Sequence, residues 1–334
     1  MASLFNILKF FKTPVSRDAV FDNLKKGDLW NDNAHYIDKW YAIEKIDNHT
    51  IIIGEPKSSQ YNLSYLIIGQ KSAILFDTGT GRRGDEVKPI SEVVKKLTDK
   101  PIQVFLSHFH FDHTGGVDEF DGVTMIDLPY IRSKIKKGAY RVSVLENVST
   151  QRPLLKVMDW IKHNDILDVG DRKIQCINTP GHSPECITLL DHQRKYVFTG
   201  DFIYKHLGGI VVFLPGSDYE KYIESIDNLV TLTGDDYRFF GAHGLPEYDK
   251  EWLVTVGTEF GKIKKNEDSM ALSASSLAPL VPLRLHAKGQ ILIYFTPFLN
   301  PGIIFSWPFY FGLLLFISLT LLIFVQMTKI ISGT

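Results

Sequence analysis

The segment that decides the fold is Ser107-His108-Phe109-His110-Phe111-Asp112-His113, which is followed after Thr114 by a pair of glycines. It comes directly after Gln103 to Leu106, an apolar run typical of a buried β-strand. In an extended loop alternate side chains share a side, so we expect His108 and His110 to point together. Asp112 and His113 then turn toward a second position as the chain bends into a helix. Imidazole and carboxylate are ligands of borderline divalent metals, so the segment indicates a metal centre.

Three further motifs place a histidine or an aspartate beside glycine, each after an apolar, strand-like run. They are Thr179-Pro180-Gly181-His182-Ser183-Pro184-Glu185, Thr199-Gly200-Asp201 and Gly241-Ala242-His243-Gly244. Glycine lets the backbone approach an ion closely or adopt positive φ. A single motif of this kind is more often an ordinary loop. Together with the histidine cluster, the three indicate further ligands of one centre.

Apolar runs rich in β-branched residues alternate along the chain with stretches of helical spacing. We expect helices at 86–97 and 219–232. The expected strands are 50–53, 63–68, 73–76, 103–106, 173–177, 187–190, 196–198 and 237–240. Two groups of strands, each followed by helices, predict an α/β fold in which two sheets pack face to face with helices outside, a four-layer αββα sandwich.

These motifs, in this order, resemble the metallo-β-lactamase superfamily, whose pattern is His-x-His-x-Asp-His, then Gly-His, Gly-Asp and a last Gly-x-x-His or Gly-His. The resemblance covers about residues 45 to 265, and it implies a centre of two metal ions. Zinc is expected, with iron or manganese as alternatives. Carried over position by position, the ligands are His108, His110 and His182 for the first metal, Asp112, His113 and His243 for the second, and Asp201 as a bridge.

The turn Asp77-Thr78-Gly79 after the strand 73–76 also fits that family, in which the aspartate supports the ligand loop by hydrogen bonds. The resemblance implies a hydrolase in which a hydroxide between two cations attacks an acyl carbon, with Asp112 orienting it. Tyr204 or His206 could donate a hydrogen bond to the leaving atom. The alternative, that both are packing or surface residues, stays open.

The Gly-Asp-x-x-Tyr segment, the loop Leu214-Pro215-Gly216-Ser217 and the helix after it resemble the glyoxalase-II-like and acyl-CoA-thioesterase-like branch. The expected reaction is hydrolysis of a thioester or ester, with a fatty acyl thioester or lipid-like substrate. No separate glutathione-binding helical domain is evident after His243. The alternative is an iron-dependent sulfur dioxygenase on the same fold, against which the complete second ligand set argues. A nuclease and a non-catalytic scaffold are less favoured readings.

The charge balance and the cysteine content of the chain indicate which kinds of partner and site to expect. Its 37 basic residues nearly cancel its 38 acidic residues, so no overall field exists to hold a polyanion, and we expect no nucleic acid partner. The two cysteines, Cys176 and Cys186, have no metal-binding spacing and are expected to be buried thiols. The oligomeric state is left open.

The C-terminal part is free of Asp, Glu, Lys, Arg and His from Gly289 to Thr328. We expect residues 303–327 to form one transmembrane helix, because this stretch is long enough to cross about 30 Å of hydrocarbon. Residues 266–302 are expected to be a linker with an interfacial piece at 291–299. Residues 1–44 are expected to be a separate N-terminal segment that lies at the interface or docks on the domain. More Lys and Arg precede the span than follow it, which predicts a single-pass membrane protein with a cytoplasmic catalytic domain.

Overall fold

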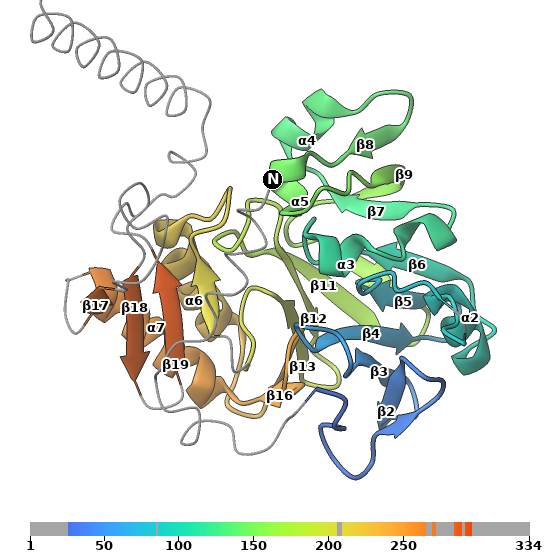
Figure 1. Ribbon diagram of the computed structural model, residues 1–334, viewed down its shortest axis with the longest axis horizontal. Helices are drawn as coiled ribbons and strands as arrows, with labels where there is room; N and C mark the ends of the chain where they lie inside the picture. The colour runs from blue at the N-terminus through green and yellow to red at the C-terminus, as the bar shows by residue number, and fades with distance from the viewer. Residues whose placement is uncertain are drawn as a thin grey trace, which may run out of the picture.

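The first of two large sheets is built mainly by the N-terminal half of the chain (Figure 1). The structure is a computed structural model, and it describes residues 26–84, 86–205, 209–264, 269–271, 284–288 and 291–295. Nine strands follow the order β1-β2-β3-β4-β5-β6-β7-β9-β8. Their bounds are β1 His35–Tyr36, β2 Ala42–Asp47, β3 Thr50–Glu55, β4 Asn62–Ile68, β5 Ala73–Phe76, β6 Ile102–Phe105, β7 Val123–Ile126, β8 Ala139–Arg141 and β9 Leu154–Ile161.

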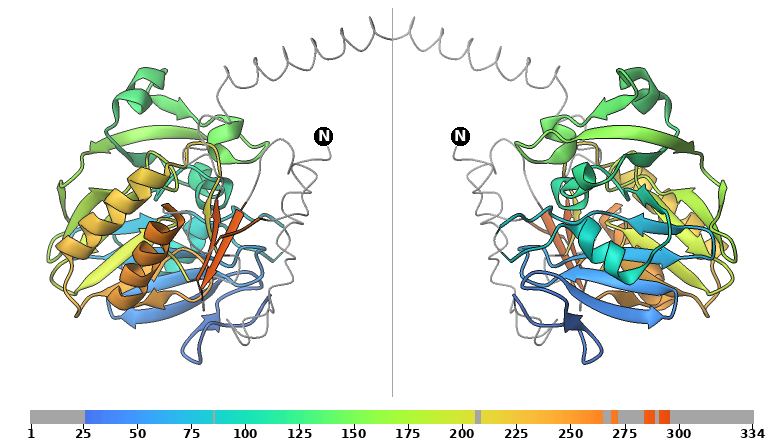
Figure 2. Two further views of the ribbon diagram at one scale, coloured as in Figure 1. Left: turned by 90° about the vertical axis from the view of Figure 1, so that its left-hand side faces the viewer. Right: turned by 90° about the vertical axis from the view of Figure 1, so that its right-hand side faces the viewer.

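The second sheet has six strands in the order β10-β11-β12-β13-β15-β16. They are β10 Ile166–Asp168, β11 Lys173–Asn178, β12 Ile187–Asp191, β13 Tyr196–Gly200, β15 Arg238–Gly241 and β16 Glu247–Tyr248. Helix α6, Tyr219–Leu232, connects the parallel strands β13 and β15. Helix α7, Lys250–Lys264, lies beside α6 on the outer side of this sheet (Figure 2).

The core lies between the two sheets and follows the two-residue period of the strands. On the second sheet Leu189, Phe198 and Phe240 point into the cluster formed with the first sheet. Their neighbours Leu190 and Val197 point the other way, into a cluster shared with α6 and α7. Helix α2, Ile90–Leu97, buries Ile90, Val93 and Val94 against the other side of the first sheet. The predicted α/β organisation is therefore confirmed, and both cysteines are free and buried as expected.

Helix α2 is shorter than predicted because Pro89 stands at its N-cap with an extended backbone, so the helix begins at Ile90. The described part of the predicted N-terminal segment, residues 26–44, belongs to the first sheet. It contributes β1 and the start of β2, and Trp30 and Tyr41 are buried in the same hydrophobic cluster as the first sheet. The boundary expected at residue 45 therefore does not separate this part from the domain.

A third sheet of four strands was not predicted. Its order is β14-β19-β18-β17, with bounds β14 Ile210–Val212, β19 Ile291–Phe295, β18 Arg284–Lys288 and β17 Ser269–Ala271. The sequence placed 266–302 in a linker and 291–299 at a membrane interface. Instead, β19 pairs in parallel with β14, and Ile291 and Ile293 are buried against the helices.

The predicted transmembrane span at 303–327 lies outside the described residues, as do residues 1–25. Among the helices that the structure describes, none has the length and apolar character needed to cross a bilayer. The span therefore stays a prediction from the sequence.

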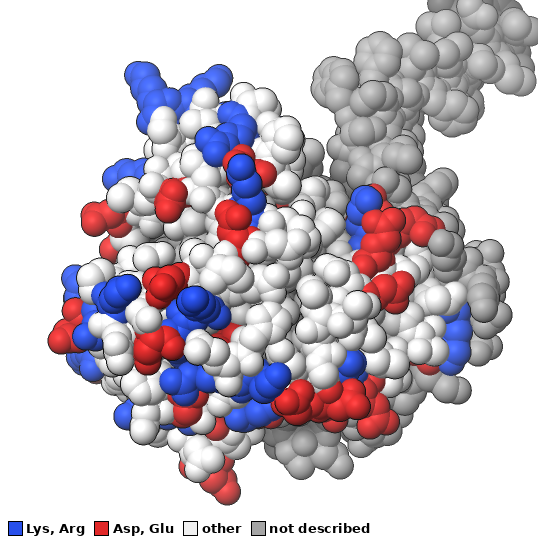
Figure 3. Space-filling model, turned by 180° about the vertical axis from the view of Figure 1, so that it is seen from behind, with Lys and Arg blue, Asp and Glu red and all other residues white. Residues whose placement is uncertain are grey.

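Four short elements complete the description between β6 and β9: α3 Phe111–Thr114, η2 Val117–Glu119, α4 Pro129–Lys134 and α5 Val144–Asn147. We call residues 129–158, which run from α4 into β9, the basic lobe. The lobe carries one acidic residue, Glu146, and seven basic residues: Arg132, Lys134, Lys136, Lys137, Arg141, Arg152 and Lys156. Lys and Arg side chains gather at the upper edge of the molecule seen from behind, over α4 and β8 (Figure 3).

Candidate metal centre

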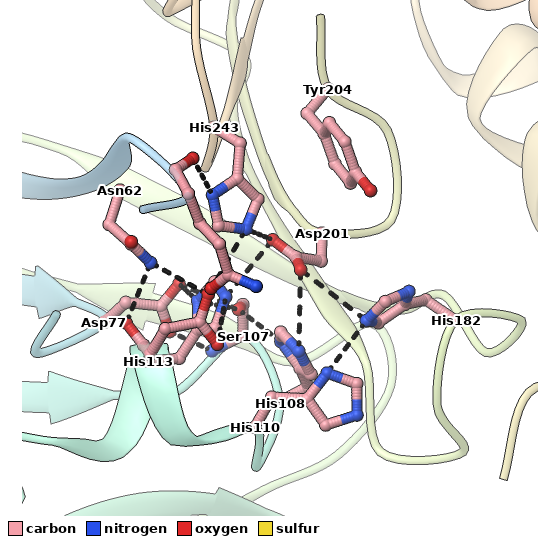
Figure 4. Close-up of polar contacts among 12 residues, drawn as sticks. Asn62, Asp77, Ser107, His108, His110, His113, His182, Asp201, Tyr204 and His243 are labelled. Carbon is pink, nitrogen blue, oxygen red and sulfur yellow. Dashed lines mark hydrogen bonds and ion pairs between the residues drawn. The ribbon is translucent and has the colours of Figure 1, made fainter. Parts of the chain in front are cut away.

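Seven predicted ligands lie close together in two groups, and Figure 4 labels all of them except Asp112. Four of them follow β6 and lead into α3. The other three follow strands of the second sheet: His182 comes after β11, Asp201 after β13 and His243 after β15. All seven side chains are buried. Their ligand atoms form two groups, each within 4.8 Å: His108, His110, His182 and Asp201, and then Asp112, His113 and His243.

The first group is closed by contacts across the two sheets. His182 Nε2 lies 3.0 Å from His110 Nδ1. Asp201 Oδ2 lies 3.6 Å from His182 Nε2 and 3.8 Å from His108 Nε2. The two Asp201 distances are longer than a hydrogen bond, as expected for atoms that surround a common point.

The second group faces the other oxygen of the same carboxylate. Asp201 Oδ1 lies 2.8 Å from His243 Nε2 and 3.2 Å from His113 Nε2. Asp112 completes the group, with its oxygens 3.6 Å from His243 Nε2 and 3.7 Å from His113 Nε2. Asp201 thus presents one oxygen to each group, as a bridging ligand requires.

Comparison with protein families agrees with this geometry. The model of the metallo-β-lactamase superfamily matches residues 60–243, which include every predicted ligand. This chain belongs to the metallo-β-lactamase superfamily.

Relatives within the superfamily include proteins named as hydrolases. The chain is 26% identical over 216 residues to a human protein named acyl-coenzyme A thioesterase MBLAC2, an alignment of 58% of this chain and 77% of that protein. It is 25% identical to hydroxyacylglutathione hydrolase GloC of Haemophilus influenzae, over 55% of this chain and 86% of that protein. The solved metallo-β-lactamase from Pontibacter korlensis shares the fold, with a TM-score of 0.50 at 16% identity over 66% of this chain and 99% of that one. The chain is accordingly a metal-dependent hydrolase.

The chemistry of the donor set fits two cations. His108 Nε2 is buried and has no hydrogen-bond partner among the described residues. His110 Nδ1 and His182 Nε2, both turned toward the first group, approach to 3.0 Å, which two lone pairs tolerate only with a cation or a proton between them. A buried polar atom without a partner costs free energy, and a metal ion removes that cost.

Hydrogen bonds to the other ring nitrogen fix which nitrogen of each imidazole faces the centre. His182 Nδ1 donates to the carbonyl of Val211 in β14 at 3.3 Å. His243 Nδ1 donates to the carbonyl of Gln60 at 3.0 Å. Each contact places a proton on Nδ1, so that Nε2 is the nitrogen available to a metal in the neutral imidazole, and such outer contacts also raise the basicity of the ligand.

Asp77 does the same for His113 and anchors the start of the ligand loop. Its Oδ2 accepts from His113 Nδ1 at 2.8 Å and from Ser107 Oγ at 2.8 Å, while Oδ1 accepts from the Ser107 backbone at 2.6 Å. Ser107 Oγ in turn lies 3.0 Å from His108 Nδ1. Asp77 has φ of 69°, which Asp tolerates better than most residues. The predicted supporting aspartate therefore lies at the place from which it can orient two ligands.

Electrostatics divide the imidazoles into two classes. Burial, reinforced by neighbouring imidazoles, holds the pKa values of His108, His110 and His182 below the ordinary value. For His113 and His243 burial also acts to lower the pKa, but nearby carboxylates, Asp201 above all, outweigh it and raise the pKa. The pKa of Asp201 itself is held well below its usual range, because His243 and His113 outweigh its burial. Without metal, protons on His113 and His243 balance the buried carboxylates.

Asn62 is a member of the site that sequence reasoning missed. Its Nδ2 donates to Asp112 Oδ2 at 3.0 Å and to the Asp112 carbonyl at 3.1 Å. Ser58 Oγ donates to Asn62 Oδ1 at 3.0 Å and so fixes the orientation of the amide. An asparagine at the start of a strand carries no signal in a single sequence, since its partner is 50 residues away.

Tyr204 lies beside the second ligand group without being one of its ligands. The ring of Tyr204 packs edge-on against His243 with the ring centres 5.2 Å apart, and its hydroxyl donates to the carbonyl of Gly209 at 2.9 Å. His206 lies outside the described residues. The role suggested for both, hydrogen bonding to the leaving atom, stays a prediction.

Proposed function

We propose that this chain hydrolyses acyl thioesters or esters with a pair of zinc ions held by the two ligand groups. The observation that carries the proposal is the position of Asp201, whose two oxygens face the first and the second group separately. Metal ions held by these residues would lower the pKa of a bound water from about 15.7 toward about 7 and would polarise a carbonyl. No serine or cysteine nucleophile is needed, and both thiols are buried with raised pKa values.

The chain's own residues have separable roles in this reaction. Asp201 and the imidazoles hold the cations, and Asp112 is placed to orient the attacking water. Asn62 supports that role, because its amide fixes the Asp112 carboxylate from behind. Asp77 keeps the Nε2 of His113 turned toward the centre. This division predicts that changes at Asn62 or Asp77 weaken the site without removing a ligand.

The acyl part of the substrate is supported by two observations. Strand β14 lies beside the first group, since its Val211 carbonyl accepts from His182, and the strand is apolar throughout. The relatives include proteins named for hydrolysis of acyl-coenzyme A and of hydroxyacylglutathione, both of which are thioesters. We favour a fatty acyl or lipid-like thioester over glutathione conjugates.

Placement at a membrane is a separate part of the proposal. It rests on the apolar tract 303–327, which would anchor a cytoplasmic catalytic domain as a single-pass protein. An epitope placed at each end of the full chain, with protease protection in sealed vesicles, tests this part alone.

The reaction is tested on the full chain in detergent, loaded with zinc. Acyl-coenzyme A esters of several chain lengths, S-lactoylglutathione, lactones, phosphoesters and β-lactams are assayed, with a chelator and zinc add-back as controls. We expect thiol release from acyl thioesters, abolished by the chelator and restored by zinc. Asp201→Asn is the matched variant and should lose nearly all of the rate. Protein that holds two zinc ions and turns over no acyl substrate overturns the proposal, whereas iron with oxygen uptake would support the dioxygenase alternative.

A further inference from the structure

The outer face of the β8–β9 hairpin mixes apolar and basic side chains. Along β9 the side chains of Leu154, Lys156 and Met158 are exposed, while Leu155 between them is fully buried. Arg141 of β8 lies opposite Leu154 in the ladder, so it shares this face. The buried face therefore fixes the register of the hairpin, and the outer face is left to solvent with 45% of Leu154 and 66% of Met158 exposed.

Exposed apolar side chains are concentrated in the basic lobe. The structure describes six large hydrophobic residues that are strongly exposed, and four of them are in the lobe: Val144, Leu145, Leu154 and Met158. The first two belong to α5, which follows β8 directly. Single exposed hydrophobic residues need no explanation, but four within residues 144–158 make this lobe the candidate for an interaction surface.

The cations around this group are largely unpaired. Lys134 is paired with Glu146, and Arg132 with Asp127 just outside the lobe. No carboxylate pairs, in the part of the chain that the structure describes, with the five remaining basic residues: Lys136, Lys137, Arg141, Arg152 and Lys156. The lobe thus carries six net positive charges in a chain whose net charge is −1.

We propose that the basic lobe is a docking surface for an anionic lipid membrane. Lipid headgroups carry the negative charge that five unpaired cations require, and the boundary below them accepts aliphatic side chains. Nucleic acid would match the cations but not the aliphatic residues between them. Each Lys or Arg near an anionic leaflet contributes about fivefold to association. The proposal concerns where the protein lies on a membrane and does not depend on the reaction that it catalyses.

Hydrogen bonds connect the docking surface to the loop that carries the metal ligands, and they fix its position relative to the metal centre. Asn147 of α5 donates to the carbonyl of Phe109 at 2.7 Å and to Thr114 Oγ1 at 3.1 Å. From α4, Tyr130 donates to the buried Glu185 at 2.7 Å, and Glu185 accepts from the Phe109 backbone at 3.2 Å. A membrane that holds the lobe therefore lies next to the loop that supplies four ligands.

The test follows one label on the full chain in two kinds of vesicle. Met158→Cys is labelled with an environment-sensitive dye, since Cys176 and Cys186 are buried and shielded from the reagent. The protein is reconstituted into vesicles of phosphatidylcholine alone, and of equal parts phosphatidylcholine and phosphatidylserine. We expect a blue shift, with quenching by nitroxide lipids, only in the second kind, and its loss in about 1 M salt, where the Debye length is about 3 Å. Any membrane tail is the same in both vesicles, so the difference reports on the lobe.

Two controls make the result decisive. The same label at Val254, which is 44% exposed on α7, should stay in water in both vesicles. Reversal of three lobe charges, Lys136→Glu with Arg152→Glu and Lys156→Glu, should shift the docking equilibrium by at least about a hundredfold. Reversal of three exposed lysines elsewhere, Lys45, Lys95 and Lys96, should leave it unchanged. A label at 158 that gives the same emission in both vesicles, whether exposed or shielded, overturns the proposal. Thiol release from a soluble thioester in the same samples keeps this outcome separate from the reaction.

Discussion

Replacement of Asp77 by asparagine tests how much the hydrogen bonds of Asp77 with His113 and Ser107 contribute to metal binding. Asn keeps the shape of the side chain and tolerates the left-handed backbone at φ of 69°, so no strain is added. The carboxylate accepts three hydrogen bonds, from the Ser107 backbone, from Ser107 Oγ and from His113 Nδ1. An amide in its place presents a donor to one of these groups. If that group is His113 Nδ1, the imidazole must place its proton on Nε2, the nitrogen that faces Asp201.

The size of the effect follows from the contact that is lost. A buried, charge-assisted hydrogen bond contributes about 1.5 to 3 kcal/mol. Loss of an outer partner of a metal-binding histidine lowers metal affinity by about 10 to 100-fold, which corresponds to about 1.4 to 2.8 kcal/mol. The two ranges agree, so we expect Asp77→Asn to weaken the site of Asp112, His113 and His243 by this factor. The site of His108 should change less, because Ser107 Oγ keeps its position next to His108 Nδ1.

The assay is a zinc titration against a competing chelator, in which the two sites appear as two affinities. The exposed carboxylate of Asp168 provides the control, since Asp168→Asn should leave both affinities unchanged. Two affinities in Asp77→Asn that equal those of the parent chain would refute the reasoning. Equal loss at both sites would show that Asp77 also holds His108, through its hydrogen bonds to Ser107.

Three further predictions concern the protons, the C-terminal strands and a buried acid. Zinc loading near pH 7 should release protons, because the pKa values of His113 and His243 are raised and both imidazoles must lose a proton to bind a metal; calorimetry in buffers of different ionisation enthalpy measures the release. A chain that ends after Lys264 should lose zinc affinity at the first site, because β14 loses its partner β19 and the Val211 carbonyl of β14 holds His182. A chain that ends after Phe295 keeps β19, and metal analysis should still find two zinc ions in it. Burial raises the pKa of Glu55 to about 7 from 4.5, so the folded chain holds a proton that the unfolded chain loses, and stability falls as pH rises through this range. In metal-free protein the unfolding free energy should therefore fall by about 3 kcal/mol more between pH 5 and 8 in the parent chain than in Glu55→Gln; parallel curves would contradict the assignment.

The sequence predicts well those features that depend on local patterns. Helix α6 matches its predicted bounds residue by residue, because its apolar spacing is regular and Asp218 caps its start by accepting from the Lys221 backbone. The ligands were found because chemistry restricts them to a few residue types beside glycine. Gly200 beside Asp201 is one such glycine, since it has φ of 55° and a Cβ there would lie 2.4 Å from the Ser107 Cβ.

What the sequence predicts poorly depends on partners that are far away in the chain. Residues 291–295 read as an apolar piece near a membrane, and nothing local indicates that β14, about 80 residues earlier, completes a sheet with them. The role of Asn62 becomes apparent only in the folded chain, where its amide donates a hydrogen bond to Asp112. The basic lobe was hidden by a net charge near zero, because an average over the whole chain cannot show that one segment is strongly positive.

The division of the ligands between the two sheets has a consequence for the folding of the chain. Each ligand group contains side chains from both sheets, so a bound cation links the two halves of the sandwich. The free energy of metal binding therefore contributes to the association of the two halves. In a chain cut between β9 and β10, zinc should tighten the association of the two fragments and a chelator should weaken it, and the difference would report free zinc without any catalysis.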